Sequence, residues 1–354
     1  MQKIRVGIIG GGFGASVHAP IFQMHEGFEV KCIASVHRGL SEKDMPNIKQ
    51  YTDWNKMLEA EELDLVSVVS APVHHCSMTM EALKNRLHVL CEKPLGMNSD
   101  QTRLMMNEII GTKRKGFVNF QWRLTPVRQR IKQILKNREL GSIHHMKYQG
   151  SFSGYEALAT QPRGWEGQKE SGGGHLFAVG SHMLDSMMWW LEEEIDHVYA
   201  SMRTVVPSFS GATEIENRNT DDAFSIMGNF RNDASFTADV FYPGIRGTGW
   251  TLEIYGSRGT LIMRNDQSIQ LSFGGDFKEL EINQMEPPYE LKAPLKHYYS
   301  GFYPMVDLLH KSINGDDGLV DLPTFDDGHK VQSVLDAIIA SANTHSRIQV
   351  NYSR

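Results

Sequence analysis

The sequence predicts an α/β protein in two parts, a doubly wound parallel sheet followed by an α+β domain with a mostly antiparallel sheet. Two observations carry this prediction. Apolar runs alternate with amphipathic, turn-bounded stretches at the start of the chain, whereas strand-like segments follow one another later on. The length of 354 residues also suffices for roughly two domains. We therefore expect domains over residues 1–122 and 123–354.

Short apolar runs mark the strands expected in the first part. They are IRVGII (4–9), VKCIAS (30–35), DLVSVVSAP (64–72), HVLCEKP (88–94) and GFVNFQW (116–122). Between the last two, NSDQTRLMMNEII has a capping Asn or Ser, followed by Leu104, Met105, Ile109 and Ile110 at helical spacing. Strands that alternate with such helical patterns indicate βαβ units and a parallel sheet.

The second part begins with a helix that carries Val127, Ile131, Ile134 and Leu135 on one face. Strand-like segments follow: HHMKYQGSF, HVYASMRTVV, AFSIMGNF, ASFTADVFY and GWTLEIYG. Consecutive strands joined by short turns predict a mostly antiparallel sheet. Near the end, DDGHKVQSVLDAIIASAN predicts a helix with Asp326 or Asp327 as its cap and an apolar face made by Val331, Val334, Leu335, Ile338 and Ile339.

Composition and charge argue against several classes of protein. A net charge of −6 gives no electrostatic reason to expect nucleic acid or an anionic membrane as a partner. No stretch approaches the ~18 to 20 apolar residues that a membrane span needs, and MQKIRVGII lacks the features of a signal peptide. The three cysteines, Cys32, Cys76 and Cys91, show no CxxC spacing, so we expect neither a disulfide framework nor a metal site. A reduced, cytoplasmic protein is the resulting expectation.

VGIIGGGFGAS, which follows the first expected strand, fits the dinucleotide-binding fingerprint as Gly10-x-Gly12-x-x-Ala15. Gly10 makes the tight turn, Gly12 lets the backbone approach a pyrophosphate, and Ala15 lets the helix pack closely on the sheet, with Phe13 and Gly14 in the same turn. The helix N-terminus then offers N–H groups to the phosphates. A tight turn without a ligand remains the alternative for the motif alone, but its place between two expected strands favours a dinucleotide.

The end of the second strand distinguishes NAD from NADP, because an acidic residue there binds the ribose 2′-hydroxyl whereas Arg accommodates a 2′-phosphate. CIASVHRG offers no acid at that point and presents Ser35, His37 and Arg38 instead. These residues favour NADP over NAD. A solvated surface turn is the alternative interpretation.

CEKPLGMN (91–98) is the first of several motifs that together resemble one family. With the glycine motif, SAPVHHCSMTMEAL, GGGHLFAVGSHMLD and PTFDDGHKVQSVLDAI, it resembles the Gfo/Idh/MocA oxidoreductases, such as glucose–fructose oxidoreductase and inositol dehydrogenase, over nearly the whole chain. The resemblance implies a Rossmann domain, a second domain whose open antiparallel sheet often forms an oligomer interface, and hence a homo-oligomer, a dimer or tetramer. It also implies NAD(P) and a sugar, cyclitol or related polyhydroxy substrate, with the nicotinamide between the domains.

By match to the Glu-Lys-Pro motif, the resemblance places Lys93 near the nicotinamide and the reacting hydroxyl. A lysine there can stabilise a developing alkoxide or relay a proton. Without the resemblance, a surface lysine at a helix entry is the favoured interpretation. The further cofactor contacts expected from the matching motifs are Ser70, Ala71, Pro72, His75 and Glu92. Cys76 stands where the family often has a histidine.

The stretch SGGGHLFAVGSHMLD is similar to the family pattern Gly-Gly-Gly-x-Leu-x-Asp-x-Gly-x-His-x-x-Asp, and departs from it at Ala178, where many members have an aspartate. His182 is expected as the proton carrier, because its unperturbed pKa of ~6.5 lies near working pH. Asp185, at i+3 on the same helical face, could orient the imidazole. Purely structural roles remain open for both residues. The glycines are interpreted as leaving room for a ligand.

Weaker substrate candidates are Arg123, Tyr155, Arg163 and Trp165, for which packing roles are equally open. The leading hypothesis is an NAD(P)-dependent dehydrogenase or reductase that acts on a secondary alcohol or the corresponding carbonyl. Two alternatives remain. Some relatives are NAD-dependent glycosidases that use transient oxidation and elimination, and the departure at Ala178 leaves open a non-catalytic, nicotinamide-binding regulatory protein.

Overall fold

The computed structural model describes residues 3–35, 39, 45, 47–211 and 215–353, and the chain divides into two compact units. Unit 1 comprises residues 1–125 and 285–329, and unit 2 comprises residues 126–284 and 330–354. The sequence-based boundary after residue 122 lies close to the end of the first segment of unit 1. The return of residues 285–329 to that unit was not expected from the sequence.

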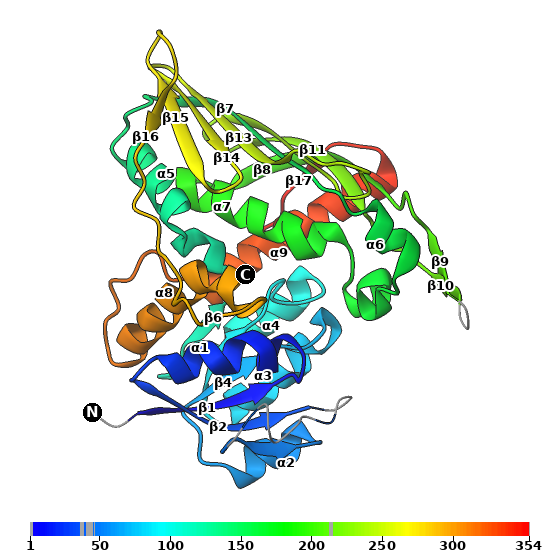
Figure 1. Cartoon of the computed structure of the whole chain (residues 1–354), viewed down its shortest axis with the longest axis vertical. Coiled ribbons are helices and arrows are strands. Elements are labelled where there is room, and N and C mark those ends of the chain that lie inside the picture. Colours follow the sequence, from blue (N-terminus) through cyan, green and yellow to red (C-terminus); the bar gives the residue numbers. More distant parts are fainter. Residues whose placement is uncertain (1–2, 36–38, 40–44, 46, 212–214, 354) are drawn as a thin grey trace. The chain divides into compact units, whose positions relative to one another are not determined.

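The strands of unit 1 form one parallel sheet (Figure 1). They are β1 (Ile4–Ile9), β2 (Phe28–Ala34), β3 (Lys49–Tyr51), β4 (Leu65–Val68), β5 (His88–Cys91) and β6 (Gly116–Val118). Their order across the described sheet is β3-β2-β1-β4-β5-β6. This is the doubly wound order of a Rossmann fold, and its topological switch point lies between β1 and β4. The predicted fold class is therefore confirmed for this unit.

Helices cover both faces of this sheet. They include α1 (Ala19–Met24), α2 (Trp54–Ala60), α3 (His75–Lys84), α4 (Ser99–Ile109) and α8 (Leu295–Ile313), with short helical turns at Gly14–His18, Pro72–His74 and Gln121–Leu124. The expected cap of α4 is confirmed, because the Asn98 side chain accepts the Gln101 N–H. The expected apolar face was wrong in part. Met105 is buried, but Leu104 is 55% exposed. Ile110, which lies just beyond the end of the helix, is 75% exposed.

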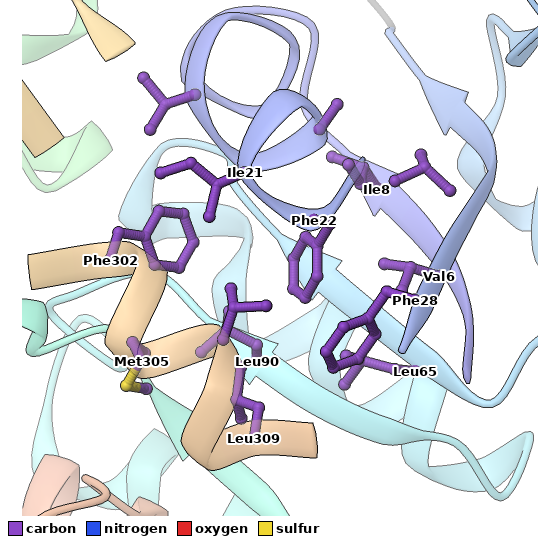
Figure 2. Packing of buried hydrophobic residues seen from close by; sticks show 14 of the residues in the cluster. Val6, Ile8, Ile21, Phe22, Phe28, Leu65, Leu90, Phe302, Met305 and Leu309 are labelled. Carbon is purple, nitrogen blue, oxygen red and sulfur yellow. The ribbon is translucent and has the colours of Figure 1, made fainter. Parts of the chain in front are cut away.

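Helix α8 completes the core of unit 1. Figure 2 shows Phe302, Met305 and Leu309 pointing toward the same cluster as Ile21 and Phe22 of α1. These α8 residues recur every three or four positions, so they form one apolar stripe that covers the sheet. The periodicity could have revealed the helix from the sequence. Pro304 in its interior argues against a helix there, because proline removes a backbone N–H.

Unit 2 is built on a larger mixed sheet (Figure 1). Its strands are β7 (Ile143–Ser151), β8 (Ile195–Arg203), β11 (Ala223–Phe230), β12 (Ser235–Phe241), β13 (Gly249–Gly256), β14 (Thr260–Arg264), β15 (Ser268–Ser272), β16 (Lys278–Leu280) and β17 (Ile348–Gln349). Their order is β16-β15-β14-β13-β7-β12-β11-β8-β17, and among these described strands only the β7–β12 pair is parallel. Burial alternates along β7 and β12, as expected for a sheet with one packed face. The predicted mostly antiparallel sheet is confirmed.

The helices of unit 2 include α5 (Pro126–Lys136), α6 (Tyr155–Thr160) and α7 (Ser181–Leu191), with helical turns at Gly164–Gly167, Lys169–Ser171 and Leu176–Gly180. A separate pair of short strands, β9 (Ser208–Ser210) and β10 (Ile215–Asn217), also belongs to this unit. Helices α5 and α7 are joined by the buried Arg128, which donates to the Ser186 and Tyr148 hydroxyls and to the Asp266 carboxylate. These contacts fix α7 against the sheet.

Helix α9 (Phe325–Thr344) contains the point at which the two units divide. The expectation that Asp326 or Asp327 caps it was wrong, because the helix begins at Phe325 and both acids lie in its first turn. Asp327 instead accepts hydrogen bonds from the N–H and hydroxyl of Thr324, the residue before the helix. This is the return contact of a capping box.

Candidate cofactor and substrate sites

The predicted cofactor residues of unit 1 follow four neighbouring strands, β2, β1, β4 and β5, at their carboxyl ends. Backbone hydrogen bonds between neighbouring strands align these carboxyl ends along one edge of the sheet. Gly10 N–H donates to Ala34 O at 2.9 Å, Val69 N–H to Ile9 O at 2.8 Å, and Glu92 N–H to Val68 O at 2.9 Å. The turns after β1, β4 and β5 therefore begin side by side at the switch point of the sheet. Dinucleotides bind at this edge of doubly wound sheets.

The glycines of the first turn differ in what requires them. Gly10 has φ +140°, and a Cβ built on it would lie 1.9 Å from Val69 O. A Cβ on Gly14 would lie 2.9 Å from Ile8 Cγ2, which reflects close packing of helix and strand. A Cβ on Gly12 meets no described protein atom within 4 Å. Gly12 therefore faces open space at the position where the fingerprint needs room for a pyrophosphate, so the turn fits a dinucleotide.

The helix that follows this turn starts with a π-helical turn at Gly14–His18 and continues as α1. Such turns are rare and frequent at functional sites. The ring of Phe13 lies edge-on to His18, with centroids 5.3 Å apart, and to Tyr298 at 4.8 Å. These two contacts fix the Phe13 ring beside the glycine turn.

Glu92 is the centre of a buried network in unit 1. Its Oε1 accepts from Asn119 Nδ2 at 2.6 Å and lies 3.0 Å from His18 Nε2, while its Oε2 accepts the Lys93 N–H at 3.2 Å. The other ring nitrogen of His18 lies 2.8 Å from the Ser67 hydroxyl. Burial alone would raise the pKa of Glu92, but the contact with His18, the Lys93 charge and the Asn119 hydrogen bond lower it. The carboxylate is therefore held as an anion directly before Lys93.

His75 lies within the fold rather than at its surface. Its Nδ1 is 2.8 Å from Pro94 O and its Nε2 is 3.0 Å from Ser70 O, so the ring links the turn after β4 to the turn that carries Lys93. Burial lowers its pKa. The neighbouring Ser70 hydroxyl donates to Ala71 O. These contacts give His75 a packing role within unit 1, and its contact with a cofactor stays a prediction.

The residues expected to choose between NAD and NADP are only partly described. Ser35 is buried directly after β2, and its N–H donates to Tyr51 O at 2.8 Å. His37 and Arg38 lie outside the described residues. The preference for NADP therefore stays a prediction.

In unit 2, the glycine-rich stretch is shaped by contacts within the protein. A Cβ on Gly173 would lie 2.2 Å from Glu166 O, and one on Gly174, which has φ +107°, would lie 2.3 Å from Asp221 Oδ1. Gly172 also has a left-handed φ of +83°. These glycines are required by the fold itself, which differs from the expected role of leaving room for a ligand.

The segment after the glycines forms a second π-helical turn, Leu176–Gly180, which runs into α7. Asp221 holds its start, because its Oδ2 accepts the Leu176 N–H at 2.8 Å. Burial raises the pKa of Asp221 to about 6. His182 and Asp185 follow in the first turns of α7 and are 3% and 1% exposed. Ala178, where the family often has an acid, is exposed.

Asp221 and His175 were not found by sequence reasoning. The His175 ring contacts the Tyr242 ring, with centroids 4.1 Å apart and a tilt of 33° between the planes, and its Nδ1 lies 3.5 Å from Arg163 Nη1. Burial, together with the Arg163 charge, lowers the pKa of His175 to about 3, so the ring is neutral at physiological pH. Asp221 lies two residues before β11, and nothing in that local sequence indicates a partner 45 residues earlier in the chain.

The weaker substrate candidates are divided between the two units. Arg123 belongs to unit 1, where its buried guanidinium donates to Asp327 at 2.9 Å, which favours a structural role. In unit 2, Glu216 accepts the Arg163 and Gly164 N–H groups and so holds the loop that carries Trp165. The Trp165 and Tyr155 side chains are exposed. Substrate contacts for all four candidates stay predictions.

The described residues also bear on metal binding and on membrane insertion. No cluster of three or more His, Cys, Asp and Glu side chains that could hold a metal ion occurs among them. No helix in the same described part of the chain is long and apolar enough to cross a membrane.

Comparisons with known proteins agree with both halves of the fold. Residues 4–120 match the model of an oxidoreductase family with an NAD-binding Rossmann fold, and residues 128–262 match the GFO/IDH/MocA C-terminal domain. Levoglucosan dehydrogenase of Pseudarthrobacter phenanthrenivorans is 23% identical in an alignment that covers 99% of this chain and 99% of its own. Myo-inositol 2-dehydrogenase of Thermotoga maritima is 23% identical and covers 89% of this chain and 92% of its own.

Among solved structures, levoglucosan dehydrogenase in complex with NADH and levoglucosan aligns with a TM-score of 0.84. The alignment covers 99% of this chain and 100% of that chain at 21% identity, so it supports the fold. The two family models match in chain order and together cover most of the sequence. The chain belongs to the GFO/IDH/MocA family of oxidoreductases, whose N-terminal domain is an NAD-binding Rossmann fold.

Proposed function

We propose that this protein is an NAD(P)-dependent dehydrogenase or reductase that acts on a secondary alcohol, or the corresponding carbonyl, of a sugar, cyclitol or related polyhydroxy compound. One observation carries the proposal. Lys93 follows β5 at the same edge of the sheet as the Gly10–Ala15 turn, where Gly12 faces open space. Named relatives that act on levoglucosan and myo-inositol support a polyhydroxy substrate.

The turn after β1 would hold the pyrophosphate, and the turns after β4 and β5 would hold the nicotinamide end. The bound dinucleotide supplies the hydride acceptor or donor. We propose NADP as the preferred form, because no acid stands beside Ser35 and because His37 and Arg38 suit a 2′-phosphate.

The chain's own groups would handle the hydroxyl of the substrate. Lys93, as an ammonium, would stabilise the alkoxide that develops as the hydroxyl proton leaves. His182 would exchange that proton, and Asp185, at i+3 on α7, would orient its imidazole. Arg123, Tyr155, Arg163 and Trp165 are proposed as further donors to substrate hydroxyls.

A non-catalytic nicotinamide-binding protein is the second candidate. It is favoured by Ala178, which provides no acid at a position where the family often has one. For either candidate, we propose a cytoplasmic homo-oligomer.

The proposed function is tested by a screen of sugars and cyclitols with NAD⁺ and NADP⁺, following reduced nicotinamide by its absorbance. Binding of each reduced cofactor is measured in parallel by fluorescence. Turnover of a polyhydroxy alcohol with a lower Kd for NADPH supports the full proposal. A lower Kd for NADH overturns the cofactor preference alone. Binding without turnover of any compound favours the second candidate, and binding of neither cofactor by the folded protein contradicts both.

A further inference from the structure

The buried hydrogen-bond network around Glu92 in unit 1 includes residues to which the proposed reaction gives no role. Ser67 on β4, His18 at the end of the π-helical turn, Asn119 after β6 and Glu92 after β5 come from four separate segments of the chain. All four side chains are buried. The network therefore connects the helix of the dinucleotide turn to the turn that carries Lys93.

The geometry specifies the charge of Glu92. Asn119 Nδ2 and the Lys93 N–H are obligate donors, so both carboxylate oxygens already accept hydrogen bonds. The third neighbour, His18 Nε2, donates to Oε1 when the Ser67 hydroxyl donates to His18 Nδ1. Three donors directed at one buried carboxyl group favour its anionic form. A proton on Glu92 would add a fourth donor hydrogen beside these three, which disfavours the protonated form.

We propose that His18 and Asn119 are positioning residues that hold Glu92 as a buried anion, and that this anion keeps the adjacent Lys93 side chain in its ammonium form. The inference rests on the proposed function of Lys93 and makes it more specific. An obligate ammonium stabilises the alkoxide through its charge and does not serve as the base. Removal of the hydroxyl proton is then left to His182.

Several titratable groups of the described structure surround this anion. The Glu92 pKa is lowered by the hydrogen bond with His18 and by the charge of Lys93. The interaction is mutual, so the Glu92 anion favours the protonated form of Lys93 by the same free energy. The buried His75 and Cys91 are also affected by the Glu92 charge, but burial is the larger influence on the pKa of each.

The test measures the acid dissociation of Lys93 in the cofactor-free protein. The lysines are labelled by trace acetic anhydride over a range of pH, and the labelled protein is digested with trypsin. Cleavage after Arg86 and Arg103 gives a peptide in which Lys93 is the only lysine, so its labelling is read separately by mass spectrometry. Neither substrate nor cofactor is needed, which separates this test from the test of the dehydrogenase activity.

Glu92→Gln is expected to increase the acid dissociation constant of Lys93 about tenfold, the order of effect of removing one opposite charge from the adjacent residue. Glu59→Gln removes the same charge from an exposed position on α2 and is expected to leave Lys93 unchanged. His18→Leu is expected to give a smaller increase, and His18→Gln, which retains a donor, is expected to restore part of the difference. Circular dichroism confirms that each variant is folded.

A Lys93 titration that is the same in the parent, Glu92→Gln and His18→Leu would overturn the inference, even if the enzyme oxidises a polyol. If Lys93 responds as expected but no substrate is turned over, the inference about the charge stands and the proposed function fails. Once a substrate is known, the alkaline limb of the kcat profile in Glu92→Gln is expected to move about one pH unit lower. Loss of folded protein alone does not move that limb.

Discussion

Gly12→Ala separates cofactor binding from folding more cleanly than any other single change in the glycine turn. The added methyl group meets no described atom within 4 Å, and Gly12 does not have a left-handed φ. Replacement of a glycine in a compatible conformation is neutral or stabilises by about 0.4–1 kcal/mol, because it restricts the unfolded chain. The melting temperature should therefore stay the same or rise slightly.

Cofactor binding is expected to respond in the opposite direction. The methyl group would occupy the space through which the backbone approaches the pyrophosphate. Loss of one hydrogen bond to a charged phosphate costs about 1.5–3 kcal/mol, which corresponds to a roughly ten- to hundredfold increase in Kd. Nicotinamide fluorescence gives the Kd for NADH and NADPH, and thermal unfolding followed by circular dichroism gives the stability.

Two further variants serve as references for Gly12→Ala. Gly275→Ala also meets open space, far along the chain in unit 2, and should change neither quantity. Gly10→Ala should destabilise unit 1 strongly, because its Cβ would lie 1.9 Å from Val69 O. An unchanged Kd in folded Gly12→Ala would refute the assignment of this turn to the pyrophosphate. A large loss of stability in the same variant would refute the structural reasoning.

Three other predictions concern stability, pH and catalysis. Phe302→Ala should destabilise the protein by about 3–5 kcal/mol in chemical denaturation, and a loss below about 1 kcal/mol would contradict the place of α8 in the core. Because the folded-state pKa of Asp221 is raised to about 6, the parent loses stability as pH rises toward and through 6, by up to about 3 kcal/mol. Asp221→Asn should therefore gain in melting temperature relative to the parent between pH 5 and pH 8, and a constant difference would refute this. His182→Asn should lower kcat at least about a hundredfold with little change in the Kd for the cofactor, whereas full turnover would remove His182 from the mechanism.

Strands and motifs that depend on local residue patterns could be predicted from the sequence. AFSIMGNF and GWTLEIYG coincide residue for residue with β11 and β13, since alternation identifies half-buried strands directly. The expected strand at 64–72 extends too far, because β4 ends at Val68 and Pro72 begins a helical turn. The glycine fingerprint was readable for the same reason, because its spacing is local.

Long-range partners could not be predicted in this way. Glu92 lies next to Lys93 in the sequence, yet its carboxylate is held by His18, 74 residues earlier, and by Asn119, 27 residues later. In the sequence, Arg123 is only a charged residue after an expected strand. Its ion pair with Asp327 depends on a segment 204 residues away. Such contacts arise only when distant segments pack together, so no periodicity or spacing in the sequence indicates them.

The most direct test of the central claim is transfer of deuterium from 4-deuterated NADH or NADPH to a panel of sugar and cyclitol carbonyl compounds. The account predicts that mass spectrometry finds deuterium at the carbon of a new secondary alcohol. Lys93→Ala, folded and able to bind the cofactor, should lose most of this transfer. Absence of deuterium from every compound, in a protein that binds the reduced cofactor, would contradict the account and favour a nicotinamide-binding protein without catalytic activity.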